Sequence, residues 1–388
     1  MRDPTEAPGD APVLDLSRCY VVPGLIDVHT HLLLEEKPGE DLGVIAALDH
    51  AVRGDADRVL SGAARARSYL DAGFTSVRDL GNSGRFLDIA LARAVQDGRV
   101  AGPSIYGSGP GLAPAGGQMP RLGADPHQLV AGEYRIVTGE VDARAAVREA
   151  IAAGARVIKM YPEATPQRTR LSVEEMRAIV SEAARHGVPV AAHATSDAAI
   201  REAVEAGASS IEHAYDVSDE TLALMAQRKV WLVATDPSVE MAMAMTETWP
   251  VRPPEAEVRE QLSGLRSRLR RAHDAGVPLA MGSDLYVPYG LGRGVGARST
   301  LEGYLDAGLS PAEALRSATF SAGELVDPGA IGVLEPNAWA DFIAMPGDPS
   351  VSLDALGSIA LVMRRGVSAS GLASTCSGSP VNGAPSGG

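Results

Sequence analysis

Short apolar, β-rich runs alternate with helix-like segments along most of this chain, and this alternation constrains the fold more than any other feature. Eight strand candidates follow one another, at residues 24–31, 75–81, 104–109, 156–161, 188–194, 209–215, 230–235 and 278–284. Several are apolar almost throughout, as parallel strands covered on both faces tend to be. Eight strands alternating with helices over about 260 residues predict an α/β fold, a (β/α)8 TIM barrel, rather than an open doubly wound sheet.

The segments between the strands carry helix start and stop signals. Ser172 and Glu175 have the spacing of a capping box, in which each residue's side chain bonds the other's backbone N–H. Asp197 is expected to cap the next helix. Ser310 repeats the start pattern, with Pro311 at the first helical position. These signals support helices between the predicted strands.

The pattern changes toward both ends of the chain, where short antiparallel strands are predicted. We expect them to pair into a small β-sandwich domain made of residues 1–24 and 330–367, outside a barrel domain of residues 25–329. Residues 368–388 are rich in Ser, Gly and Pro and poor in apolar side chains, and we expect them to be disordered.

Charge and composition limit the kind of partner. The 388 residues carry 35 Lys and Arg against 49 Asp and Glu, a formal net charge of −14. Nucleic acid or an anionic membrane would be repelled by this charge, so we expect neither as a partner and a small-molecule substrate instead. The two cysteines, Cys19 and Cys376, exclude a Cys-rich zinc site or a disulfide framework and favour a reducing compartment. With no secretory signal visible at the N-terminus and no apolar run of membrane-spanning length, we expect a cytoplasmic protein.

Unusual polar residues fall at the ends of the predicted strands. They are His29, His31, Lys159, His193, His213 and Asp284. Residues i and i+2 of a strand point to the same side, so the two imidazoles of the first pair would project together. Catalytic groups of such barrels lie at the carboxyl ends of the strands. Each residue also has an ordinary alternative, such as a hydrogen-bonded rim histidine or a turn-capping aspartate, but the joint placement favours a metal site.

Lys159 requires a separate account, because a protonated ammonium cannot bind a cation and would be costly to bury beside one. Carboxylation by carbon dioxide would turn the amine into an anionic carbamate with two oxygens, able to bridge two metals. The alternative is a lysine that reaches solvent from the strand end. Beside four strand-end histidines, the carbamate is the favoured interpretation.

These residues lie in motifs that match a known family. The segments "PGLIDVHTHL", "VIKMY", "VPVAAHA", "SIEHA" and "MGSD", in this order, resemble the amidohydrolase superfamily. The branch with the closest resemblance is that of the imidazolonepropionase-like and Xaa-Pro dipeptidase-like members, which have a binuclear metal site. The resemblance covers roughly residues 12–367, and it implies symmetric assembly into a homo-oligomer.

The resemblance also implies a ligand set of two divalent ions. His29 and His31 would bind the more buried metal together with Lys159 and Asp284. Carboxylated Lys159 would bridge to a second metal held by His193 and His213. Zinc is the default for such imidazole and carboxylate donors, although manganese, iron or cobalt would fit them.

The implied activity is hydrolysis of an amide-type C–N bond in a dipeptide, an N-acyl amino acid or a cyclic amide. A metal-bridging hydroxide would attack the carbonyl, and Asp284 would take the proton and pass it to the leaving nitrogen.

The chain departs from its relatives around the expected substrate. Gln118 stands where relatives commonly carry a histidine. Tyr161 and Arg293 are candidates for binding a substrate carboxylate, Arg293 because of its planar donor fork. Most of the β-strands that usually precede the first histidine pair are missing, so the small β-domain would be truncated relative to the family.

Other functions stay open at this stage. A mononuclear deaminase of a heterocycle shares the paired histidines, the two later histidines and the aspartate, but does not need a carboxylated lysine. A specialised biosynthetic hydrolase or cyclase would suit the altered loops. A metal-bound barrel kept as a scaffold without turnover is the non-enzymatic alternative.

Overall fold

The structure is a computed structural model, and it describes residues 14–35, 54–118, 132–165, 168–246, 251–286 and 292–369. Every predicted strand of the barrel is present. These strands are β2 (Leu25–Thr30), β3 (Phe74–Asp79), β4 (Ser104–Gly107), β7 (Ile158–Met160), β8 (Val190–Ala194), β9 (Ser210–His213), β10 (Trp231–Val233) and β11 (Leu279–Ala280). Two short strands were not predicted, β5 (Gly111–Ala113) and β6 (Tyr134–Ile136).

The strands form two parallel sheets, ordered β2-β3-β4 and β11-β10-β9-β8-β7-β5-β6. Backbone hydrogen bonds connect the sheets on both sides. Val28 donates to the carbonyl of Met281, just after β11, and Arg156, just before β7, donates to the carbonyl of Gly107, both at 3.0 Å. The central parallel sheet of an α/β fold is thereby confirmed. Its parallel strands bring their carboxyl ends to one side of the molecule.

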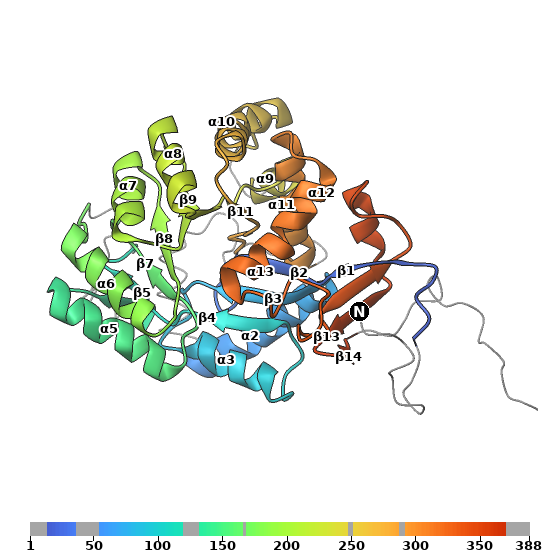
Figure 1. Cartoon of the computed structure of the whole chain (residues 1–388), viewed down its shortest axis with the longest axis horizontal. Coiled ribbons are helices and arrows are strands. Elements are labelled where there is room, and N and C mark those ends of the chain that lie inside the picture. Colours follow the sequence, from blue (N-terminus) through green and yellow to red (C-terminus); the bar gives the residue numbers. More distant parts are fainter. Residues whose placement is uncertain are drawn as a thin grey trace, which may run out of the picture.

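Helices cover the outside of the strands (Figure 1). They are α2 (Gly54–Asp71), α3 (Leu87–Gln96), α5 (Gly139–Ala153), α6 (Val173–Arg185), α7 (Asp197–Ala206), α8 (Asp219–Arg228), α9 (Val239–Met245), α10 (Glu255–Asp274), α11 (Arg293–Asp306), α12 (Pro311–Ser317) and α13 (Phe320–Val326). The capping boxes at Ser172 and Ser310 are both present. The predicted cap of α7 was wrong by one residue: Ser196 caps the helix through Ala199 N–H, and Asp197 begins it. Asp197 instead accepts a hydrogen bond from the backbone of Ser218.

Both ends of the described chain meet in a small antiparallel sheet, on the right in Figure 1. Its strands are β1 (Tyr20–Pro23), β12 (Phe342–Met345), β13 (Leu361–Arg364) and β14 (Val367–Ser368), in this order. A short 3-10 helix, η3 (Leu353–Ser358), lies between β12 and β13. The described residues thus form one sheet here, and they do not include the second facing sheet that a β-sandwich requires. Most of the predicted disordered tail (368–388) lies outside the described residues.

Two further expectations concern the environment of the protein. Cys19 is disulfide-bonded, which does not fit the reducing compartment that the cysteine content suggested. No helix in the described part of the chain is both long enough and apolar enough to cross a membrane.

Candidate metal centre

The six strand-end residues singled out in the sequence meet in one cavity of about 170 Å³. The side chains that line it are His29, His31, Asn82, Gln118, Tyr134, Lys159, Tyr161, His193, His213, Asp284 and Tyr286. Strand register explains part of this convergence, since Lys159 on β7 pairs with Ala191, and His193 on β8 pairs with Glu212 on β9.

His29 and His31 are each held through the Nδ1 atom. Nδ1 of His29 lies 2.7 Å from Glu212 Oε2, and Nδ1 of His31 lies 2.7 Å from the carbonyl oxygen of Gly81. The Nε2 atoms face Asp284, whose Oδ1 is 3.4 Å from that of His29 and 3.1 Å from that of His31. With Nδ1 engaged, Nε2 is the atom left to bind a metal. These three residues form a group that could hold a metal ion.

His193 and His213 lie beside this group. Their ring centroids are 4.5 Å apart, and the ring of His213 is 5.1 Å from that of His29. Nδ1 of His213 is 2.8 Å from Thr235 Oγ1, an arrangement that orients the imidazole as the Glu212 contact orients His29.

Lys159 is almost fully buried, and among the described residues its Nζ atom has no hydrogen-bond partner. Nζ lies 5.2 Å from the centre of the Tyr161 ring. Burial lowers the pKa of this ammonium to about 8, against the opposing effect of Glu212 and Asp284. The lowered pKa increases the share of neutral amine, which is the nucleophile toward carbon dioxide, so the Lys159 environment favours carboxylation.

Burial also favours neutral imidazoles in the centre. It lowers the pKa of His193 to about 3, with a further contribution from Lys159, and it holds the pKa values of His29 and His213 well below the ordinary value. For Asp284, burial raises the pKa, but the nearby His29 and His31 outweigh it, so the pKa lies below its ordinary value. Neutral imidazole and ionised carboxylate are the forms that bind metals, so the donor set fits divalent cations.

Several backbones at the strand ends adopt the left-handed region without being glycine. The φ angles are +74° at His213, +57° at Thr235 and +49° at Asp284. Such conformations are uncommon for residues with a Cβ and cluster at functional sites. At Asp284 the backbone N–H donates to the carbonyl of His29 at 2.8 Å, which fixes this residue against the first strand.

A buried ion pair behind His29 was not found by sequence reasoning. Glu212 accepts hydrogen bonds from Arg78 Nη2 at 2.8 Å and from Ser210 Oγ at 2.6 Å, on the oxygen that does not contact His29. Arg78 also donates to the carbonyl of Val28. The partner of Arg78, on β3, is thus Glu212, on β9. The sequence contains one signal of this ion pair, because a charged residue stands in each of two strands that are otherwise expected to be buried. Buried charges are costly unless they are paired.

The three proposed substrate residues lie in different places. Tyr161 and Gln118 line the cavity. Both ends of the Gln118 amide are engaged, with Nε2 donating to the carbonyl of Glu163 and Oε1 accepting from Thr165 N–H. Arg293 is buried outside the cavity lining, and its guanidinium donates to the carbonyls of His31, Leu34 and Tyr286 at 2.7–2.8 Å. In this structure Arg293 supports the backbone that carries His31.

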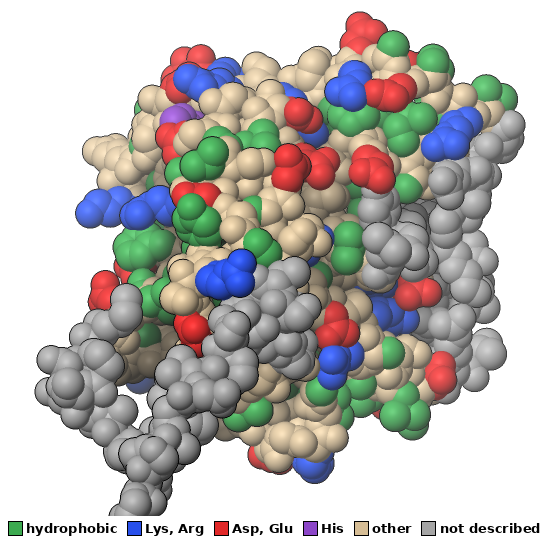
Figure 2. Space-filling view, turned by 90° about the vertical axis from the view of Figure 1, so that its right-hand side faces the viewer, with side chains coloured by type: hydrophobic (Ala, Val, Ile, Leu, Met, Phe, Trp, Pro, Cys, Tyr) green, Lys and Arg blue, Asp and Glu red, His purple; other side chains and the backbone are tan. Residues whose placement is uncertain are grey.

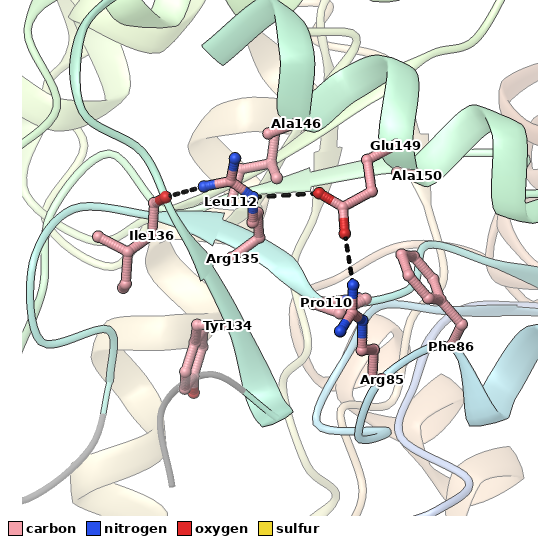
Figure 3. A pocket seen from close by; sticks show the side chains of 10 residues that line it. All are labelled: Arg85, Phe86, Pro110, Leu112, Tyr134, Arg135, Ile136, Ala146, Glu149 and Ala150. Atoms are coloured by element: carbon pink, nitrogen blue, oxygen red, sulfur yellow. Dashed lines mark hydrogen bonds and ion pairs between the residues drawn. The ribbon is translucent and has the colours of Figure 1, made fainter. Parts of the chain in front are cut away.

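A second cavity, of about 490 Å³, shares Tyr134 with the first as a lining residue (Figure 3). Its wall is largely apolar, with Phe86, Leu112 and Ile136 among the lining residues. Arg85 and Arg135 at its edge both bind Glu149, each at 3.2 Å.

The sequence and the structure of this chain resemble those of known proteins. The sequence profile of the amidohydrolase family matches residues 20–369. The chain belongs to the amidohydrolase family. Ochratoxinase of Aspergillus niger is 30% identical over 363 residues, covering 85% of this chain and 70% of its relative. Among solved structures, a Xaa-Pro dipeptidase with bound methionine is 26% identical, with a TM-score of 0.75 over 92% of this chain and 88% of the other. A further amidohydrolase structure is 30% identical, with a TM-score of 0.79 over 93% and 89% of the two chains.

This amidohydrolase is therefore a hydrolase that acts on carbon–nitrogen bonds, as the resemblance implied. Its structural neighbours include prolidase-like enzymes and ochratoxinase.

Proposed function

We propose that this amidohydrolase is a binuclear metal-dependent enzyme that hydrolyses an amide-type C–N bond in a dipeptide, an N-acyl amino acid or a cyclic amide. The observation that carries the proposal is the buried Nζ of Lys159, which has no hydrogen-bond partner among the described residues and lies among four imidazoles and a carboxylate. We also infer that the two parallel sheets close into one (β/α)8 barrel, an inference supported by the backbone hydrogen bonds on both sides.

The residues present fit two divalent ions, with zinc as the default. His29, His31 and Asp284 would hold one ion and His193 and His213 the other, with carboxylated Lys159 between them. When bound, such ions polarise a carbonyl and supply hydroxide near neutral pH.

Asp284 is the proposed proton carrier. Its carboxylate lies within 3.4 Å of both histidines of the first pair, and 23% of its side chain is exposed to the cavity side, so it is the acidic ligand that a substrate can reach. With a pKa below its ordinary value, it is ionised at neutral pH and able to accept a proton from water. The same carboxyl would then deliver this proton to the leaving nitrogen.

The substrate end of the cavity is lined by hydroxyl and amide groups. Tyr134, Tyr161 and Tyr286 lie there with Asn82 and Gln118, and Lys159 is the one cationic side chain among the described lining residues. We propose that Tyr161 and Gln118 orient the substrate through hydrogen bonds, Gln118 through the second N–H of its amide, since the first binds the Glu163 carbonyl. Arg293 is the weaker candidate, because it lies outside the described lining of the cavity and its donors bind backbone carbonyls.

The test compares wild-type enzyme with Asp284→Asn on N-acyl amino acids, dipeptides including Xaa-Pro, and cyclic amides. We expect the variant to keep its metal and to lose about 10²–10⁴-fold in kcat, since it lacks the general base. Near-wild-type turnover by the variant would remove Asp284 from this role. Ammonia release from a heterocycle by enzyme with one metal per chain would favour the deaminase.

A further inference from the structure

A third cavity, of about 550 Å³, lies between α3, β4 and the small sheet. Its position is remote from the metal centre, because Ser104 begins β4 and Arg156 precedes β7, whereas the metal-centre residues gather at the carboxyl ends of the strands. Four arginines line the cavity, and Asp327 is the acidic residue that lines it with them. The arginines are Arg93, Arg156, Arg364 and Arg365.

The positive charge of this cavity is only partly neutralised. Arg156 Nη2 lies 3.6 Å from Asp327 Oδ2, which also accepts a hydrogen bond from the Tyr106 hydroxyl at 2.9 Å. Within the described part of the chain, the guanidinium groups of Arg93, Arg364 and Arg365 have no ion pair with any carboxylate. Asp341 offsets part of this charge, because its carboxylate interacts electrostatically with Arg364 and Arg365 while its Oδ1 accepts the backbone N–H of Arg365. Such a cationic concentration is unexpected in a chain of net charge −14.

The cavity of Figure 3 provides an internal comparison. There, Arg85 and Arg135 share Glu149, and Arg135 Nη2 also binds Asp142 at 2.6 Å. The two arginines of that cavity are therefore balanced by two carboxylates. In the third cavity, four arginines are accompanied by two carboxylates, those of Asp327 and Asp341, so positive charge is in excess among the described residues.

An aromatic ring and a buried hydrogen-bond donor belong to residues that line the third cavity. The Arg365 guanidinium carbon lies 4.3 Å from the centre of the Trp339 ring, and Trp339 is 44% exposed. Among the described residues, the buried Nε of Arg365 has no hydrogen-bond partner. Arg364 Nε donates to Ser104 Oγ at 3.3 Å. Burial, followed by repulsion from Arg365, lowers the pKa of Arg364, and the carboxylate of Asp341 opposes this shift only in part.

We propose that this cavity is a binding site for a small phosphate monoester that carries a planar ring, the class to which nucleoside monophosphates belong. Guanidinium forks match phosphate oxygens in pairs, and an exposed indole offers a stacking surface for the ring. The volume falls in the range of small-molecule sites, roughly 300–1,000 Å³. Because the site is separate from the metal centre, its occupancy does not depend on the proposed hydrolytic function.

The experiment titrates adenosine monophosphate and inorganic phosphate into the purified metal-loaded protein and follows heat and tryptophan fluorescence. We expect saturable binding of adenosine monophosphate, weaker binding of phosphate alone, and a loss of affinity of at least about tenfold in the Arg156→Gln/Arg365→Gln variant, because two charged donors are removed. Arg177→Gln, an exposed arginine on α6, serves as the matched control and should bind like wild type.

The Trp339→Phe variant tests whether the ligand binds in this cavity or at the metal centre. We expect it to abolish the fluorescence change while the titration still releases heat. Equal affinity in the double-arginine variant and in the control would place any bound phosphate elsewhere and overturn the proposal. Failure of the wild-type protein to bind adenosine monophosphate would also overturn it.

Discussion

At the scale of single residues, His29 depends on charges that lie behind it. Glu212 holds Nδ1 of the imidazole with one carboxylate oxygen and Arg78 with the other, and all three side chains are buried. This arrangement leaves Nε2 free on the cavity side and raises the basicity of the ring as a ligand. Glu212 and Arg78 therefore belong to the metal centre, although neither side chain would touch a metal.

Glu212→Gln should weaken metal binding by about 10–100-fold, because the amide cannot supply the same charge to His29. It should also lower stability, since Arg78 would be left buried without a counter-charge. Metal affinity measured by competition with a chelator, well below the unfolding temperature, checks the first effect. Glu205→Gln, an exposed position on α7, is the control. Wild-type affinity in Glu212→Gln would show that the ion pair does not support the ligand.

At the scale of secondary-structure elements, the close approach of β11 to β2 sets the position of the first histidine. Gly282 follows β11, and a Cβ atom there would lie 2.5 Å from Val233 Cγ1 and 2.6 Å from His29 Cβ. Only a residue without a side chain allows this approach. The contact joins the end of the last parallel strand to the beginning of the metal centre.

Gly282→Ala should therefore displace His29 and reduce both metal content and kcat. We expect kcat to fall by at least about tenfold, because a small misplacement of a catalytic group can lower the rate by about 10²-fold. Gly264→Ala in α10 is the control, because open space surrounds that position; it should be neutral or stabilise by about 0.5–1 kcal/mol. Metal analysis and steady-state kinetics on both variants make the test. Unchanged activity in Gly282→Ala would contradict the packing argument.

The first turn of α3 contains a buried acid whose ionisation should affect stability. Burial, reinforced by Asp79, raises the pKa of Asp88 from 3.8 to about 7, and its Oδ1 has no hydrogen-bond partner within the described residues. Its other oxygen accepts the backbone N–H of Gly109 at 2.8 Å. The folded protein thus binds this proton more tightly than the unfolded chain does.

The contribution of Asp88 to stability should be complete below pH 4 and be lost as the pH rises through about 7. Asn cannot ionise, so the free energy of unfolding of Asp88→Asn should fall less between pH 4 and pH 7 than that of the wild type. Denaturant unfolding at several pH values measures it. Identical pH profiles for the variant and the wild type would show that Asp88 does not titrate in this range.

Local sequence signals predicted the elements better than the contacts between them. The eight barrel strands and the capping boxes at Ser172 and Ser310 follow from apolar runs and cap spacing, which depend on neighbouring residues alone. Arg293 illustrates the limit, because its guanidinium binds three backbone carbonyls, two of them about 260 residues away along the chain. Strand β5 is flanked by Pro110 and Pro114, and β6 is interrupted by Arg135, so neither shows the longer apolar run that identified the equally short β10.

At the scale of the whole molecule, a sheet made from both ends of the chain lies beside the parallel sheets. The register of β1 against β12 runs from Tyr20 with Met345 to Pro23 with Phe342, directly before β2 begins. This pairing anchors the strand that carries His29 and His31. On the face that includes this sheet, acidic and basic side chains are interspersed (Figure 2).

The central claim, that six side chains at the ends of five strands hold two cations with carboxylated Lys159 between them, is tested most directly by crystallography at a zinc absorption edge. Crystals would be grown from protein supplied with zinc and bicarbonate. We expect two anomalous peaks, one beside His29 and His31 and one beside His193 and His213, with carbamate density continuing from Lys159 Nζ between them. A single peak with an unmodified lysine, or no peak at these residues, would contradict the account.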